Sequence, residues 1–200
     1  MVESTEHSDK EDFEDWFSSS KTLKNILFIM SDDHTIQGIG VYNSRLVGLN
    51  PTPTLDKLAA EGTTFRRAHC TNAICSPSRA AILTGQYGHM NGVLDLHGHL
   101  PSERQYLPKE LKKAGYETAI IGKWHLKNEP GAFDHYEVLR GQGTYFDPDL
   151  RVQGDKLWPD NVVKTVGHSS DVITNRALAW LKNRKSDKPF ALFHHFKAPH

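Results

Sequence analysis

An uninterrupted apolar run, Asn25-Ile26-Leu27-Phe28-Ile29-Met30, stands directly before the polar tetrapeptide Ser31-Asp32-Asp33-His34. A short run without alternating polar residues is typical of a strand that is buried on both faces, as in a parallel sheet covered by helices. The polar residues then follow the carboxyl end of that strand. Open α/β sheets bind their ligands at this edge.

Helical and strand patterns alternate along the rest of the chain. Caps and apolar spacing predict four helices, at Pro53–Gly62, Ser76–Thr84, Leu107–Gly115 and Asp171–Arg184. Further strands are predicted at Tyr116–Gly122 and Pro189–Phe193, with a weaker candidate at Thr63–Ala68. Residues 127–167 show little periodicity and are expected to form a long functional loop. The order predicts an α/β fold, a doubly wound, mostly parallel sheet with helices on both faces.

Charge and hydropathy restrict the partners and the domain organisation. The 24 Lys and Arg residues balance 24 Asp and Glu residues, which gives no reason to expect nucleic acid or an anionic membrane as a partner. No apolar run approaches the ~20 residues of a membrane span. Residues 1–22 are predicted to be a polar, disordered leader without the features of a secretory signal, and residues 23–200 a single catalytic unit. Because the chain stops just after a strand, at His200, we expect the domain to be truncated at its C-terminus.

Asp32 and Asp33 place two carboxylates side by side after the first strand. Such a pair is common in turns, so by itself it is weak evidence for a metal site. Like charges this close repel each other, and a divalent cation commonly compensates them. Carboxylates without a cysteine pair favour calcium or magnesium over zinc.

The second chemically informative segment is Cys75-Ser76-Pro77-Ser78-Arg79. A cysteine in such a place is ordinarily an inert, buried thiol. Here it is predicted to open a helix, where free N–H groups and the helix dipole stabilise an anion. Arg79 follows about one turn later and can fold back toward the same point. The sequence offers no assignable His and Asn or Asp set for a simple cysteine hydrolase.

The segment Cys75–Gly85, read Cys-x-Pro-x-Arg followed by Leu-Thr-Gly, resembles the signature of type I sulfatases. Other blocks match that family in the same order: the strand ending at Asp32-Asp33, the segment Pro53–Phe65, the segment Gly115–His125 and Lys197-Ala198-Pro199-His200. The resemblance runs from about Lys24 to His200. It implies the alkaline-phosphatase-like fold and a sulfuric ester hydrolase in which a maturation enzyme oxidises Cys75 to formylglycine.

The resemblance also implies a role for each matched residue. Asp32 and Asp33 would hold Ca²⁺, or Mg²⁺, together with the modified Cys75. Arg79 would stabilise the ionised formylglycine hydrate, and one hydroxyl of that hydrate would attack the sulfur as the alcohol leaves, giving a covalent sulfated intermediate. Expulsion of sulfate then regenerates the aldehyde. Lys123, His125 and His200 are the other catalytic candidates: Lys123 and His200 would contact the sulfate or assist the leaving alcohol, and His125 would be the base. Residues His194 and His195 are expected to be ordinary strand residues.

The substrate and the compartment remain open from the sequence. Aromatic residues in the segment from Phe133 to Pro148 are similar to those of sulfatases acting on sulfated glycans, and could stack on a sugar, although a packed surface excursion explains them equally well. One alternative function is a phosphatase or phosphonate hydrolase of the same superfamily. Another is a catalytically incomplete fragment, and the 200 residues alone are expected to be inactive. The family is usually exported or lysosomal, whereas no signal peptide is visible here.

Overall fold

The computed structural model describes residues 23–43 and 45–200, so the predicted leader lies outside the described residues. Six strands form one sheet in the order β1-β6-β2-β3-β4-β5. Their bounds are β1 Ile26–Asp32, β2 Glu117–Gly122, β3 His135–Leu139, β4 Asp149–Val152, β5 Val162–Lys164 and β6 Phe190–Pro199. The first four strands in that order pair in parallel, and the last two pairings are antiparallel. The predicted α/β class with a mostly parallel sheet is confirmed.

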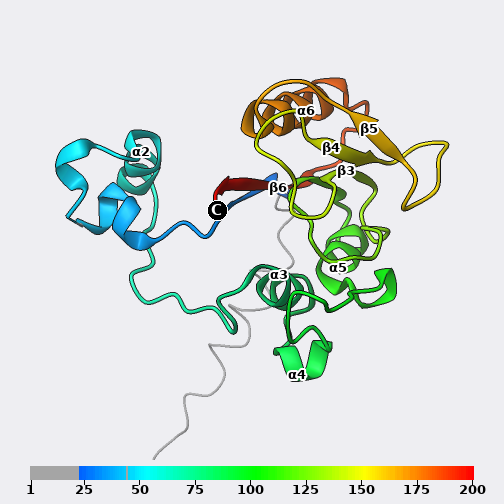
Figure 1. Cartoon of the computed structure of the whole chain (residues 1–200), viewed down its shortest axis with the longest axis horizontal. Helices are drawn as coiled ribbons and strands as arrows, with labels where there is room; N and C mark the ends of the chain where they lie inside the picture. Colours follow the sequence, from blue (N-terminus) through cyan, green and yellow to red (C-terminus); the bar gives the residue numbers. More distant parts are fainter. Residues whose placement is uncertain (1–22, 44) are drawn as a thin grey trace, which may run out of the picture.

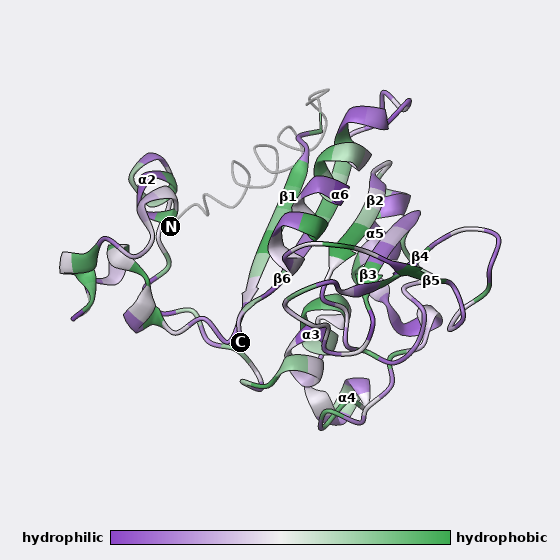
Figure 2. Cartoon of the chain, turned by 45° about the horizontal axis from the view of Figure 1, so that its top comes forward, coloured by the Kyte–Doolittle hydropathy of each residue, from purple (hydrophilic) through white to green (hydrophobic). Residues whose placement is uncertain are grey.

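The helices that cover the sheet lie on opposite faces of it (Figure 1). Helices α3 (Cys75–Thr84) and α5 (Tyr106–Lys113) contribute Ala80, Leu83 and Leu107 to the core on one face. On the other face, α6 (Ser169–Asn183) packs Val172 and Ile173 against the sheet. The central strands are hydrophobic along most of their length (Figure 2), as expected for strands covered on both sides. The predicted burial of the first strand on both faces is wrong for the described residues, because β1 lies at one end of the sheet and its Leu27 and Ile29 are each 53% exposed.

Three 3₁₀ turns and one helix form a small lobe that stands away from the sheet (Figure 1). The helix is α2, Pro53–Glu61, and the turns are η1 Ile36–Gly38, η2 Gly40–Tyr42 and η3 Val47–Leu49. Asp56 of α2 accepts a hydrogen bond of 2.6 Å from the N–H of Val41, which ties the helix to η2. None of the residues of α2 is buried. The short remaining helices are α4, Gly88–Asn91, and the 3₁₀ turn η4, Ser102–Arg104.

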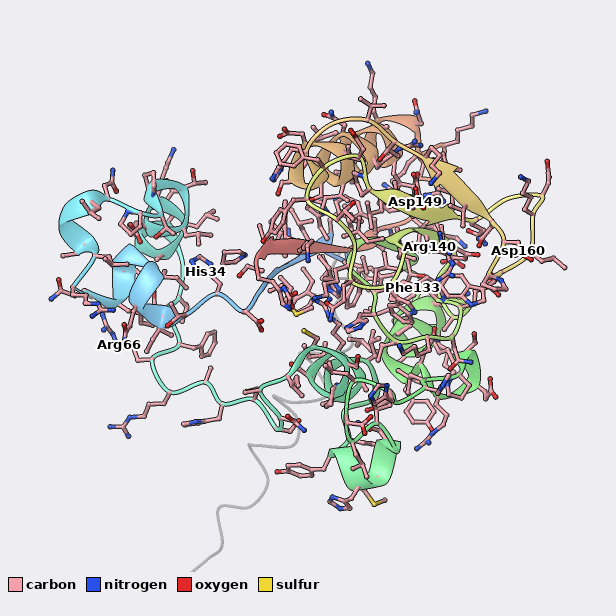
Figure 3. All side chains as sticks on the ribbon, in the orientation of Figure 1. His34, Arg66, Phe133, Arg140, Asp149 and Asp160 are labelled. Carbon is pink, nitrogen blue, oxygen red and sulfur yellow. The ribbon has the colours of Figure 1, made fainter. Side chains whose placement is uncertain are left out.

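Two expectations about local structure are wrong. The segment from Thr63 to Ala68 is not a strand: it has suitable residues but no strand beside it, and Phe65 is 73% exposed. Residues 127–167 are not one long loop, because they contain β3, β4 and β5. These strands are short and carry charged residues, so they lack an apolar pattern. Asp149 of β4 pairs with Lys164 of β5 at 2.8 Å and with Arg140, which follows β3, at 3.3 Å (Arg140 and Asp149 are labelled in Figure 3).

Strand β6 lies between β1 and β2 and therefore holds the functional edge of the sheet together. Asp32 at the end of β1 is paired with Pro199 of β6, and Gly122 at the end of β2 is paired with His195. The register of β1 shifts between Met30 and Asp32, which marks a local irregularity just before the acidic pair. Polar residues that follow these strands consequently meet at one edge. None of the described helices is long and apolar enough to cross a membrane.

Candidate active site

The two acidic residues at the end of β1 lie in different environments. Asp32 is 5% exposed, whereas the side chain of Asp33 is 57% exposed. Asp33 has a positive φ of 53°, which turns the chain out of the strand immediately after Asp32. The pair therefore presents one carboxylate to the interior and the other to the open edge.

Cys75 is the first residue of α3 and is 8% exposed. The helix starts at Cys75 because the preceding residue, Ile74, is extended. No side chain caps the free N–H groups of its first turn. It ends at Thr84, where Gly85 takes the left-handed conformation with φ 65°. The Cys75 Sγ atom lies 3.6 Å from Asp32 Oδ1 and 3.6 Å from Lys123 Nζ. The predicted position at the opening of a helix is confirmed.

Asp32, Arg79 and Lys123 form a buried charged cluster beside Cys75. The Lys123 ammonium donates to Asp32 Oδ2, and Arg79 Nη2 donates to Asp32 Oδ1 at 3.2 Å. Lys123 is 0% and Arg79 3% exposed, so water does not screen these contacts. Burial raises the pKa of Asp32, but the hydrogen bond from Lys123 and the charges of Arg79 and Lys123 outweigh it and lower that pKa. Burial lowers the pKa of Arg79, and Asp32 opposes that effect; the guanidinium stays protonated at neutral pH.

His125 follows β2 in a left-handed backbone conformation, with φ 55°, and is 8% exposed. Ser76 holds this residue in place: its hydroxyl donates to the carbonyl of His125 at 2.7 Å and lies 3.4 Å from Nδ1 of the ring. Burial, with the charges of Lys123 and Lys127, lowers the pKa of His125 to about 4. The imidazole is therefore neutral at pH 7 and able to accept a proton.

His200 lies at the end of β6, at the exposed rim of the same site. Its Nε2 atom is 3.6 Å from Asp33 Oδ2. Tyr145 donates its hydroxyl proton to the carbonyl of His200 at 2.5 Å, and its ring stacks on His168. Phe146, beside Tyr145, is 69% exposed. The rim of the site is thus aromatic on the side of His200.

The donor set can be compared with the needs of a divalent cation. One atom each of Asp32, Cys75 and His200 lie within 4.8 Å of one another, and Asp33 is next to them. Two carboxylates are suitable ligands for calcium or magnesium, and an oxygen at the position of the Cys75 sulfur would be a third hard donor. Calcium takes six to eight oxygen ligands. The described residues fit part of such a shell.

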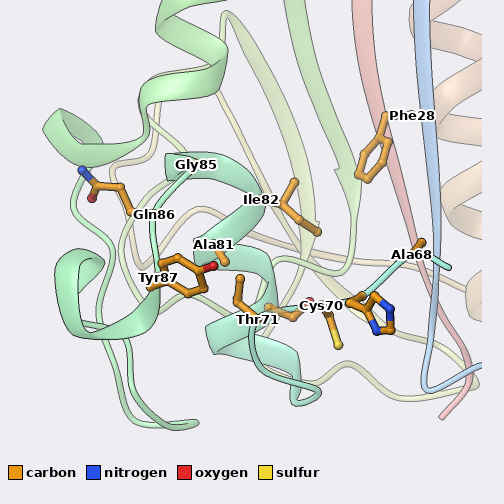
Figure 4. Close-up of a pocket in the computed structure, with 11 residues that line it drawn as sticks. Phe28, Ala68, Cys70, Thr71, Ala81, Ile82, Gly85, Gln86 and Tyr87 are labelled. Atoms are coloured by element: carbon orange, nitrogen blue, oxygen red, sulfur yellow. The ribbon is translucent and has the colours of Figure 1, made fainter.

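Two cavities meet near Cys70. The one that contains the acidic pair, Cys75 and Arg79 has a volume of about 450 Å³. A larger one of about 780 Å³, drawn in Figure 4, lies between α3 and the segment around Cys70, and is lined mainly by apolar residues such as Phe28 and Ile82. Asp32, Cys75 and Arg79 line the smaller cavity, and none of them lines the larger one.

Comparison with known proteins agrees with this geometry. The model of the Sulfatase family matches residues 24–200, which is most of the chain. The chain belongs to the sulfatase family. The segments that carry the acidic pair, Cys75 and Lys123 all lie within the matched range.

Several proteins with known names are similar in sequence to this chain. The chain is 43% identical over 180 residues to N-acetylglucosamine-6-O-sulfatase of Bacteroides thetaiotaomicron, with 88% of this chain and 30% of the relative covered. It is 30% identical to human N-acetylgalactosamine-6-sulfatase, with 88% and 39% covered. A solved sulfatase in complex with its substrate D-glucosamine-2-N,6-O-disulfate superposes with a TM-score of 0.81 at 43% identity, covering 88% of this chain and 35% of that one. The chain therefore spans about a third of the length of these relatives.

Most of the predicted site residues lie at one edge of the sheet, namely Asp32, Cys75, Arg79, Lys123, His125 and His200. The side chain of Asp33, also predicted as a metal ligand, is exposed and lies outside the group formed by Asp32, Cys75 and His200. Ser76 and His195 were not among the predicted site residues, and Tyr145 was predicted only as one of the aromatic residues from Phe133 to Pro148. Ser76 could have been predicted as a site residue from the sequence, because it follows Cys75 inside the cysteine motif. Tyr145 and His195 come from distant segments, and only the folded chain shows that they approach the site.

Proposed function

We propose that this chain supplies the nucleophile-bearing part of a sulfuric ester hydrolase that removes sulfate from a glycan. The observation that carries the proposal is the position of Cys75 at the start of α3, within 3.6 Å of both Asp32 and Lys123 and beside Arg79. Two cations and a helix N-terminus converge there, and this combination favours an anionic substrate and a negatively charged transition state.

Oxidation of Cys75 to formylglycine by a maturation enzyme is the second part of the proposal. The hydrated aldehyde would supply an oxygen nucleophile and an internal route for releasing sulfate. Asp32 and Asp33 would hold a calcium or magnesium ion, which polarises a sulfate oxygen when bound. Arg79 and Lys123 stabilise negative charge next to the nucleophile, and the neutral imidazole of His125 accepts a proton.

The proposed substrate class is a 6-O-sulfated amino sugar within a glycan. Two of the named relatives act on the 6-sulfate of an N-acetylated hexosamine, as their names state, and the solved relative holds a 6-O-sulfated glucosamine. Tyr145 lies beside His200, where a sugar ring would lie if its sulfate entered the charged cluster, and the exposed Phe146 follows it in the chain and contacts His168. Phe133, in contrast, is 3% exposed and packs in the core, so it takes no part in recognition.

The test uses a chain of the length of the relatives that contains this sequence. Cys75→Ala is expected to lower turnover of D-glucosamine 6-sulfate more than about 10³-fold, because the nucleophile is removed. Cys70→Ala is the matched control: this second cysteine is exposed at the edge of the same cavity, and the loss of its thiol should lower turnover far less than the loss of Cys75. Retained turnover in Cys75→Ala would refute the proposal. Mass spectrometry of the peptide containing Cys75 reports whether the thiol has become an aldehyde.

Comparing substrates separates this function from the alternatives. Faster turnover of the amino sugar sulfate than of an aryl sulfate is expected if the aromatic rim binds a sugar. A matched phosphate ester hydrolysed faster than both would instead identify a phosphatase of the same superfamily.

A further inference from the structure

His195 lies in the middle of β6, is 2% exposed and is absent from the set of site residues expected from the sequence. Burial and the nearby charge of Arg79 hold the pKa of His195 well below its usual value, so its ring is neutral. Its Nδ1 atom lies 3.1 Å from Nη1 of Arg79 and 3.3 Å from the carbonyl oxygen of Lys123. The same Nη1 donates to that carbonyl at 2.8 Å.

These three distances determine which ring nitrogen carries the proton. Arg79 can only donate, because the guanidinium remains protonated in proteins. A proton on Nδ1 of His195 would therefore face a donor at 3.1 Å. With Nδ1 unprotonated, Nη1 gives one proton to His195 and the other to the carbonyl of Lys123. The Nε2 atom then carries the ring proton, and it has no partner among the described residues.

The unpaired Nε2–H is a clue to what the residue does. A buried N–H without a partner destabilises the fold, so a histidine here needs a compensating interaction. The hydrogen bond that Arg79 donates to Nδ1 of the same ring is that compensating interaction. The rings of Phe28 and Phe193 pack edge-on against His195, with centroids 5.7 and 6.0 Å away, and restrict its rotation. The ring thus presents a fixed acceptor to Arg79.

We infer that His195 is a positioning residue for Arg79. Its neutral ring accepts a hydrogen bond through Nδ1 and, with the carbonyl of Lys123, fixes the plane of the guanidinium. Nη2 of the same group then points at Asp32, beside Cys75. Because the guanidinium is buried, water does not replace an acceptor that is lost. The effect of His195 on turnover rests on the proposed function; its effect on Arg79 does not.

The first test measures the proton position, and it is independent of catalysis. Histidine labelled with ¹⁵N is followed by NMR at pH 7 in a chain of the relatives' length, and the signals of His195 are assigned by their loss in His195→Asn. An unprotonated Nδ1 and a protonated Nε2 are expected. A protonated Nδ1 would overturn the inference, whether or not the chain is a sulfatase.

The second test compares substitutions that differ in one acceptor atom. In His195→Asn an amide oxygen can take the place of Nδ1, whereas His195→Leu offers no acceptor. The Leu variant should lower kcat about 10- to 100-fold with little change in KM, and the Asn variant should recover most of the loss. His194→Leu is the matched control, because His194 lies on the opposite face of β6, against Thr174 of α6. It should leave kcat within about twofold of wild type.

A double-mutant cycle completes the design. In an Arg79→Lys background, His195→Leu should cause no further fall in kcat, because the group that His195 positions is no longer there. Equal and additive losses in both backgrounds would show a purely structural role and refute the inference. If the wild-type chain hydrolyses no sulfate ester, the proposed function fails, and the NMR result alone decides the inference.

Discussion

The charge of Asp32 is predicted to be the main compensation for two buried cations, and Asp32→Asn removes that charge with almost no change in shape. Lys123 and Arg79 are 0% and 3% exposed and both contact this carboxylate. Breaking a buried ion pair by removing one partner costs about 3–5 kcal/mol, since the other charge is left uncompensated. For a domain of this size, 1 kcal/mol corresponds to about 2–4 °C in Tm, so a fall of about 6–20 °C is expected.

The assay is thermal unfolding followed by circular dichroism at pH 7, with a chelator present so that no cation alters the charge balance. Asp33→Asn is the matched control: it makes the same change one residue away, on a side chain that is 57% exposed, and should alter Tm by no more than about 2 °C. The decisive variant is Asp32→Asn combined with Lys123→Met, which removes one of the two stranded cations. This double variant should be more stable than Asp32→Asn alone. If it is equally stable or less stable, the charge argument is wrong.

Three further predictions concern acidity, packing and recognition. The pKa of His125 is about 4 in the folded chain and ~6.5 in the unfolded chain, so the unfolded state binds more protons between these two values. The free energy of unfolding therefore falls as the pH drops from 6.5 to 4, by up to about 1.4 kcal/mol per pH unit. Urea unfolding at pH 7 and pH 5 should show this slope, and the slope should be smaller in His125→Asn. Gly122→Ala would place a Cβ 1.8 Å from the carbonyl oxygen of His195, at a φ of 113°. This variant should be destabilised by about 1–3 kcal/mol or more in urea unfolding. Gly154 has open space around it, so Gly154→Ala should not be destabilised in this way. Tyr145→Ala should raise KM for a 6-sulfated amino sugar but not for an aryl sulfate; equal effects on both substrates would exclude a sugar-binding role.

The sequence predicted the part of the fold in which local pattern and tertiary structure agree. The apolar run before Asp32 becomes β1, and the capping signals from Pro77 to Gly85 lie in the last eight residues of α3 and its C-cap. It could not predict β3 to β5, because strands of three to five residues with charged side chains show no period. It also suggested a strand near Phe65, where the residue types are suitable but no neighbouring strand is present to pair with them.

The residues of the site also divide into those that the sequence predicted and those that it could not predict. Asp32, Cys75 and Lys123 follow strands or open a helix, and position along the chain was enough to bring them to one edge of the sheet. The role inferred for His195 depends on which of two adjacent histidines faces Arg79. Two equivalent residues in the apolar run of β6 give no such signal, since the face each occupies depends on the register of three strands.

The central position of β6 also sets the order in which the site can form during synthesis. His195 follows Arg79 by 116 residues, and β1 has no strand partner among the described residues except β6. At about 5–20 residues per second, a ribosome needs about 6 to 23 s to make that stretch. Throughout this interval β1 cannot yet pair with β6, so the sheet edge beside Cys75 is incomplete. If an enzyme modifies this cysteine, it has these seconds in which to act before β6 joins β1 to the sheet.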